Sequence, residues 1–186
     1  IPMSSTFPIV TELIRLFNVK AAIFDLDGTL IDNNHYHLLA WQEYLRQNNR
    51  PITMDEYRRH FNGRTNRDVI EYVFPGISQE DEIARRTLEK EAVYREIYRP
   101  HIKPVDGLLP LLENFRQCNI PMAIATSGIQ VNIDFMFSHI PVQEFFPVVL
   151  NSAHIQKGKP DPEIYLKTAA KLSVEPENCL VFEDAA

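Results

Sequence analysis

The chain has 186 residues, of which 45% are hydrophobic and 24% charged, as in one folded domain or one domain with a large insertion. Its net charge of -6 and its lack of Lys- or Arg-rich runs argue against a nucleic-acid partner. Two cysteines, Cys118 and Cys179, do not make a disulfide framework, and no apolar run approaches the roughly 18 residues of a membrane span. Residues 1–17 lack the basic and apolar regions of a signal peptide, so we predict a cytoplasmic protein with no membrane partner.

The first predicted strand covers residues 19–26, an apolar run that suits a buried parallel strand. Helical patterns follow it instead of a second strand. The predicted helices cover residues 35–49, 53–61, 66–74 and 78–102, and Asn62-Gly63 separates the second from the third. The last of them begins with Ser78 and charged residues and stops before Pro104.

After Pro104, helices and strands alternate. Helices are predicted over residues 105–119, 131–140 and 161–173, and strands over residues 120–128, 145–151 and 178–184. Because these strands are continuously apolar, we predict a parallel α/β sheet. The helical block interrupts the alternation after the first strand. We therefore predict an α/β core of residues 1–33 and 103–186 and an inserted helical cap of residues 34–102.

Polar residues follow three of the predicted strands, where ligands bind in open α/β sheets. These residues are Asp25, Asp27, Thr126, Ser127, Glu183 and Asp184, and Lys159 lies in a loop before a helix. Several of these residues also have a purely structural explanation. Thr126 and Ser127 could be a helix N-cap, Glu183 and Asp184 could form a turn, and Lys159 could be a solvated charge. Together, the carboxylates form an oxygen site suited to Mg²⁺, with a hydroxyl and an ammonium beside it for phosphate oxygens.

The stretch DLDGTL, residues 25–30, resembles the first motif of the haloacid dehalogenase superfamily of phosphotransferases. Its four fixed letters arise by chance on the order of 10⁻⁵ per position, so the match is specific. Thr126 resembles the second motif, Lys159 in GKPDPEIY the third, and VFED at residues 181–184 the fourth, in the family's order. The resemblance implies a Rossmann-like core with a C1-type helical cap. It also implies a further helix, strand and helix after residue 186, so the C-terminal part of the core is expected to be missing.

The resemblance implies a role for each matching residue. Asp25 would be the nucleophile that forms an aspartyl-phosphate, and Asp27 would be first the general acid and then the general base. Mg²⁺ would be bound by Asp25, by the backbone carbonyl of Asp27, and by Asp184 with Glu183. The predicted phosphate-binding residues, which would offset charge in the transition state, are Thr126, Ser127 and Lys159.

The predicted cap is expected to supply specificity by closing over the site and excluding water. The candidates in it are Arg64, Asn66, Lys90 and His37. The chain looks most like the branch that contains β-phosphoglucomutase and small phosphosugar phosphatases. By this resemblance Lys90 matches a lysine for a distal phosphate and His37 a linker histidine, whereas Asn66 replaces an arginine of the mutases. For the cap cations a solvated helix face is the alternative.

We therefore predict a monomeric, Mg²⁺-dependent phosphatase that hydrolyses a small phosphorylated metabolite, in particular a sugar phosphate. A phosphosugar mutase is the first alternative, since it would share the core residues and differ in how well the cap shields the intermediate from water. A dehalogenase is disfavoured because a haloacid needs no proton at its leaving group, and Asp27 would supply one. A catalytically idle phosphate- or metal-binding module is the third possibility.

Overall fold

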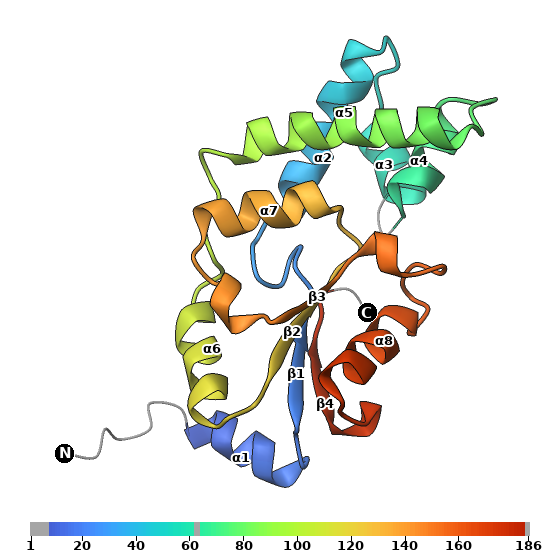
Figure 1. Cartoon of the computed structure of the whole chain (residues 1–186). Coiled ribbons are helices and arrows are strands. Elements are labelled where there is room, and N and C mark those ends of the chain that lie inside the picture. The colour runs from blue at the N-terminus through green and yellow to red at the C-terminus, as the bar shows by residue number, and fades with distance from the viewer. Residues whose placement is uncertain (1–7, 62–63, 185–186) are drawn as a thin grey trace. The chain divides into compact units, whose positions relative to one another are not determined.

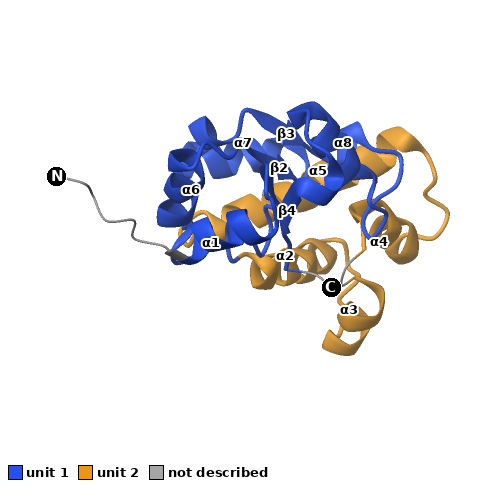
Figure 2. Cartoon of the chain, turned by 90° about the horizontal axis from the view of Figure 1, so that it is seen from below, with its two compact units in different colours: residues 1–32, 103–184, 186 blue, residues 33–102, 185 orange. Residues whose placement is uncertain are grey.

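The computed structural model describes residues 8–61 and 64–184, and these divide into two compact units (Figure 2). The core unit comprises the described residues up to Asp32 together with Lys103–Asp184, and the helical unit comprises those of Asn33–Ile102. Asn33 thus belongs to the helical unit, where its Nδ2 donates to the hydroxyl of Tyr94 at 2.6 Å. The predicted separator Asn62-Gly63 lies outside the described residues. That the helical unit acts as a cap stays a prediction.

A four-stranded parallel sheet in the order β3–β2–β1–β4 lies at the centre of the core unit (Figure 1). Its strands are β1 (Ala21–Phe24), β2 (Met122–Ala125), β3 (Val148–Leu150) and β4 (Cys179–Phe182). In the register of the sheet, Phe24 pairs with Ile124 of β2 and with Phe182 of β4. The residues that follow β1, β2 and β4 therefore emerge at one edge. The predicted parallel α/β sheet is confirmed, and each strand lies within its predicted range.

Helices cover both faces of this sheet (Figure 1). They are α1 (Pro8–Leu16), α6 (Leu108–Gln117), α7 (Gln130–His139) and α8 (Glu163–Leu172), with the short 3₁₀ helices η1 (Gln143–Phe145), η2 (Ser152–His154) and η3 (Pro176–Asn178). On one face, Ile23 and Ala125 pack with Ile164 of α8. On the other face, the ring of Phe24 lies 4.5 Å from that of Phe182 and 6.1 Å from that of Phe115 on α6. Aromatic pairs of this kind add roughly 0.5–1.5 kcal/mol each beyond the area they bury.

No helix is predicted at the N-terminus, yet residues Pro8–Leu16 form α1. Its only residue fully packed into the core is Val10, and the larger apolar residues Ile9, Leu16 and the following Phe17 are exposed. The apolar residues Ile9, Val10, Leu13, Ile14, Leu16 and Phe17 recur at helical spacing, so the sequence does carry a helical signal, and the prediction missed it. Across the described residues, no helix combines the length and the apolar character that crossing a membrane requires.

The helical unit consists of α2 (Asn34–Gln47), α3 (Met54–His60), α4 (Asn66–Val73) and α5 (Glu80–Tyr98), as predicted. The apolar residues that these helices bury together are Trp41, Tyr44, Leu45, Phe61, Val69, Ile70, Val73 and Ile83. Side-chain caps fix two of the helix starts. Thr53 Oγ1 accepts from the N–H of Glu56, and Thr65 forms a reciprocal capping box with Asp68.

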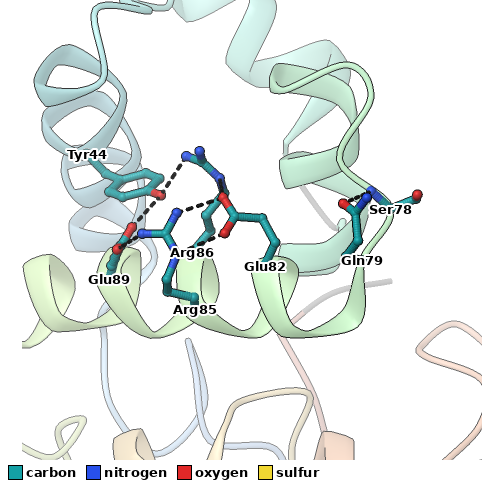
Figure 3. Close-up of polar contacts among 7 residues, drawn as sticks. All are labelled: Tyr44, Ser78, Gln79, Glu82, Arg85, Arg86 and Glu89. Atoms are coloured by element: carbon teal, nitrogen blue, oxygen red, sulfur yellow. Dashed lines mark hydrogen bonds and ion pairs between the residues drawn. The ribbon is translucent and has the colours of Figure 1, made fainter.

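Polar contacts between α5 and α2 join the two helices (Figure 3). Arg86 Nε donates to Glu82 Oε1 at 2.8 Å, and Tyr44 of α2 donates its hydroxyl to Glu89 Oε2 at 3.1 Å. Arg85 pairs with both Glu82 and Glu89 and is more exposed. Exposed ion pairs each contribute about 0–1 kcal/mol, so the buried apolar residues supply most of the stability of this unit.

Candidate active site

The site begins at the tight turn after β1. Asp25 is the first residue after the strand, and its N–H donates to the carbonyl of Phe182 on β4 at 2.9 Å. The carbonyl of Leu26 then accepts from the N–H of Leu30 at 2.9 Å, which closes the turn. Gly28 has a φ of 75°, in the left-handed region that glycine adopts without a steric penalty. The turn leaves the Asp25 residue only 7% exposed.

Lys159 connects the ends of β1 and β4. It lies in the loop before α8, and its Nζ is 2.9 Å from Asp25 Oδ1 and 2.6 Å from Glu183 Oε2. Tyr165, in the first turn of α8, donates its hydroxyl to the same Oε2 of Glu183. The Lys159 ammonium also lies over the Tyr165 ring, 5.0 Å from its centroid. One loop and helix thus place a cation and a phenol against two strand ends.

The end of β2 supplies a hydroxyl beside the second aspartate. Thr126 is buried, its N–H donates to the carbonyl of Leu150 at 3.0 Å, and its Oγ1 accepts from the N–H of Gly128 at 3.0 Å. A Cβ atom on Gly128 would lie 3.2 Å from Thr126 Oγ1 and 3.6 Å from Asp27 Oδ2. Asp27 and Thr126 therefore lie around the same point, and the glycine keeps that space open.

Burial and charge perturb the ionisation of this cluster. Burial raises the pKa of Asp25 to about 7, with Lys159 opposing the rise and Asp27 adding to it. Burial alone would lower the pKa of Lys159, but Asp25 and Glu183 raise it above its ordinary value, so the lysine stays a cation. Burial and the hydrogen bond to Glu183 raise the pKa of Tyr165, so the phenol stays a donor. The cluster therefore holds more negative charge than one lysine offsets.

The arrangement of oxygens fits a Mg²⁺ ion. Oxygens of Asp25, Glu183 and Asp184 all lie within 4.8 Å of one another. Asp25 Oδ1 is buried, and among the described residues no donor reaches it with hydrogen-bond geometry, Lys159 included. A divalent cation bound by carboxylate oxygens would offset both the repulsion and the burial of these groups.

The structure brings most of the predicted core residues to one edge of the sheet. Those close together are Asp25, Asp27, Thr126, Lys159, Glu183 and Asp184, whereas Ser127 is exposed beside Thr126. The carboxylate cluster consists of Asp25, Glu183 and Asp184. Asp27 is predicted to bind Mg²⁺ through its backbone carbonyl, so its carboxylate is not expected in this cluster. The catalytic, phosphate-binding and metal-binding roles of these residues stay predictions.

The cap candidates all lie in the helical unit, in different surroundings. Lys90 is only 2% exposed, and its Nζ lies 2.9 Å from Glu91 Oε1 and 3.0 Å from His37 Nδ1. Asn66 donates to the same Oε1 of Glu91 at 2.8 Å, and Arg64 is exposed. The solvated-face alternative is therefore wrong for Lys90, because the packing of α5 on α2 buries its whole side chain.

Two residues of these networks were missed from the sequence. Tyr165 sits at an ordinary helix position, and its only signal was that it is the last residue of the GKPDPEIY pattern. Glu91 sits in a charged helix that predicts exposure. Their contacts join elements distant in the chain, so they appear only when the helices are packed.

Comparison with known proteins gives related phosphatases and a mutase. The chain is 32% identical over 170 residues to validoxylamine A 7'-phosphate phosphatase of Streptomyces hygroscopicus subsp. limoneus, covering 89% of this chain and 77% of that protein. It is 30% identical over 171 residues to a phosphorylated carbohydrates phosphatase of Thermotoga maritima, covering 90% and 77%. It is 27% identical over 176 residues to β-phosphoglucomutase of Bacillus subtilis, covering 90% and 76%.

A solved structure has the same fold. The crystal structure of a family IA, variant 3 hydrolase from Entamoeba histolytica superposes with a TM-score of 0.81 at 35% identity, covering 90% of this chain and 76% of that one. The family description that matches residues 22–186 is haloacid dehalogenase-like hydrolase. The phosphatases among the relatives agree with the predicted enzyme class, a phosphoric monoester hydrolase. The chain belongs to the haloacid dehalogenase-like hydrolases.

Proposed function

We propose that the protein is a Mg²⁺-dependent phosphatase that hydrolyses a small sugar phosphate through a phosphorylated Asp25. The observation that carries this proposal is the state of Asp25. Its Oδ1 is buried and lies 2.9 Å from the Lys159 ammonium, in a cluster with excess negative charge. A carboxylate that is poorly solvated and held beside a cation suits attack on an electrophilic phosphorus.

In the first step, an oxygen of Asp25 attacks the phosphorus, and the bond from phosphorus to the ester oxygen breaks. Asp27 protonates that leaving oxygen, so the sugar leaves as an alcohol. Thr126 donates its hydroxyl to a phosphoryl oxygen, with Ser127 beside it, and Lys159 offsets the charge on the phosphoryl group. Both aspartates follow one strand and Thr126 follows its neighbour, which supports their action on one group.

In the second step, Asp27 takes a proton from water as the water oxygen attacks the phosphorus of phosphorylated Asp25. The bond from phosphorus to the Asp25 oxygen breaks, inorganic phosphate leaves, and the carboxylate is restored. Asp27 thus ends protonated again, in the form that the first step of the next cycle requires.

The residues that would hold Mg²⁺ are Asp25, Asp184, Glu183 and the backbone carbonyl of Asp27. When bound, the ion supplies positive charge to the phosphoryl oxygens and offsets the repulsion between phosphate and carboxylates. The mutual approach of three carboxylates to within 4.8 Å supports this assignment. Removal of divalent cations is therefore expected to abolish turnover.

A sugar phosphate is the proposed substrate because named relatives act on phosphorylated carbohydrates. The second candidate is a phosphosugar mutase, favoured by the similarity to β-phosphoglucomutase over 90% of the chain. A mutase would return the phosphoryl group of Asp25 to a second sugar hydroxyl instead of to water. We place the phosphatase first because Asn66 stands where the mutase resemblance expects an arginine. A cytoplasmic location and a monomeric state stay predictions.

The test is phosphorus NMR of the protein with Mg²⁺ and a panel of phosphosugars that includes hexose 1-phosphates, with a trace of hexose bisphosphate. Inorganic phosphate that appears without a new ester signal is the expected result. Conversion of a 1-phosphate to a 6-phosphate with little free phosphate would establish the mutase instead. Turnover by Asp25→Asn equal to that of the wild type would overturn both enzyme proposals.

A further inference from the structure

Tyr165 and Lys159 converge on a single atom, Oε2 of Glu183. The phenol hydroxyl and the ammonium both donate to this oxygen. The ammonium also contacts Asp25 Oδ1, but at 2.9 Å instead of 2.6 Å and without hydrogen-bond geometry. Lys159 is thus shared between two carboxylates, and the shorter contact is the one to Glu183.

In the proposed reaction, this sharing works against Lys159. The charge of the lysine is needed at Asp25 and at the transferring phosphoryl group, whereas the contact with Glu183 draws it away. A second donor on Glu183 Oε2 reduces that pull, because an oxygen that already accepts one hydrogen bond holds a second donor less tightly. The Tyr165 hydroxyl is placed to be that second donor.

We propose that Tyr165 is a positioning residue that limits the hold of Glu183 on Lys159 and so leaves the ammonium available to Asp25 and the phosphoryl group. The proposal rests on the phosphatase function proposed above. Tyr165 does not need to touch the substrate for this role, since it acts through Glu183. The aromatic ring adds a cation–π contact to the same ammonium, and Tyr165→Phe retains this ring while it removes the hydroxyl.

The helical unit provides a matched control. There Tyr72 donates its hydroxyl to Glu56 Oε1 at 3.2 Å, and Arg50 pairs with the same oxygen. Like Lys159, Glu183 and Tyr165, this trio combines a cation, a carboxylate and a phenol, but it has no part in the proposed chemistry. Tyr72→Phe is therefore expected to leave turnover and phosphate affinity unchanged.

The experiment is a double-mutant cycle of Tyr165→Phe and Glu183→Gln, with two readouts. The first is kcat and KM on the best ester of the panel, and the second is the Kd of inorganic phosphate measured by calorimetry. Both are measured at a Mg²⁺ concentration that saturates each variant, because Glu183 is itself a proposed Mg²⁺ ligand. In the wild-type background, Tyr165→Phe is expected to lower kcat and weaken phosphate binding by about 10-fold each, the size of a hydrogen bond to a charged group. In the Glu183→Gln background both effects should vanish, because a neutral amide no longer competes for the lysine.

Two results would overturn the proposal while leaving the phosphatase intact. One is a wild-type value of kcat and of phosphate affinity in Tyr165→Phe. The other is an equal loss in both backgrounds, which would mean that the hydroxyl acts independently of Glu183. A wild-type protein that neither hydrolyses the esters nor binds phosphate would overturn the proposed function, and this inference with it.

Discussion

Each unit pairs a lysine with a carboxylate, but the burial and the balance of charge differ. In the helical unit, the buried Lys90 lies against the buried Glu91, with His37 beside it. In the core unit, the half-buried Lys159 contacts the buried Asp25 and the half-buried Glu183, and further carboxylates lie nearby. A buried pair with matched charge and several hydrogen bonds holds helices together, whereas an excess of carboxylates around a buried one calls for a cation or a substrate.

The difference extends to hydrogen bonding. Asn66 adds a second donor to Glu91, so the pair around Lys90 gains further partners. Asp25 Oδ1, by contrast, has no donor in the described part of the chain. Unsatisfied buried groups cost stability, and proteins keep them where they serve a reaction. The contrast therefore separates a structural lysine from one in a reactive site.

The largest expected effect comes from removing the lysine of the core unit. Lys159→Met should lower kcat by at least about 100-fold, because it takes away the positive charge beside Asp25 and the phosphoryl group. The measurement is steady-state kinetics with Mg²⁺ on the best phosphosugar. Lys167→Met, which changes an exposed lysine on α8, the helix that follows the Lys159 loop, is the matched control. A loss below about 3-fold would show that the charge of Lys159 is not used in the reaction.

Removing the lysine of the helical unit should instead lower stability. Lys90→Met leaves Glu91 buried with its main cation gone, at a cost of about 3–5 kcal/mol in the free energy of unfolding. Urea denaturation followed by circular dichroism measures this loss. The double variant Lys90→Met with Glu91→Leu should recover most of it, since no buried charge remains. If Lys90→Met unfolds at the wild-type urea concentration, the pair is not structural.

The sequence was informative where chemistry requires particular letters at fixed spacing. Asp25 and Asp27 stand directly behind an apolar strand, and the glycine that follows them is needed for the positive φ of the turn. The parallel sheet followed from apolar strands that alternate with helices. These features are local, so one stretch of chain carries the whole signal.

The remainder depends on contacts between distant parts of the chain. Lys90 resembles any charged helix residue, and its burial arises only when α5 packs against Trp41 and His37 of α2. Tyr165 reaches Glu183 only because α8 and β4 lie side by side in the core unit. The helix α1 is a different case, because its apolar residues recur at helical spacing and the prediction missed this local signal.

The burial of Asp25 predicts a pH-dependent stability in protein stripped of metal. The folded-state pKa of Asp25 is raised from 3.8 to about 7, so the folded state binds the extra proton and the free energy of unfolding falls as pH rises through this window. Such a change corresponds to roughly 4 kcal/mol at most. Asp25→Asn should therefore be more stable than the wild type at pH 8 and equal to it near pH 4.

Thermal unfolding in EDTA across this pH range checks the sign. The gain of Asp25→Asn at pH 8 should shrink when Mg²⁺ is added, because the ion stabilises the wild-type carboxylates but has one ligand fewer in the variant. If Asp25→Asn is less stable than the wild type at pH 8 without metal, the raised pKa of Asp25 is contradicted.

The smallest effect on the free energy of unfolding is expected at Arg86 of α5. Arg86→Met removes contacts with Glu82 and with Tyr44, and the pair with Glu82 is partly exposed, so the free energy of unfolding should fall by about 1 kcal/mol or less. Chemical denaturation at low and high salt measures it, and high salt should reduce the difference. A loss as large as that of Lys90→Met would mean that surface pairs, not the buried pair, hold the helical unit together.

The most direct test of the central claim is to trap the phosphorylated protein. The protein with Mg²⁺ and a turned-over phosphosugar is quenched in acid. Borohydride then reduces the acyl phosphate to homoserine with release of phosphate, and peptide mass spectrometry locates the homoserine that marks the phosphorylated residue. We expect the modification at Asp25, and none in Asp25→Asn. Phosphate release with no phosphoryl group on Asp25, or with one on another residue, would contradict the assignment of the core site.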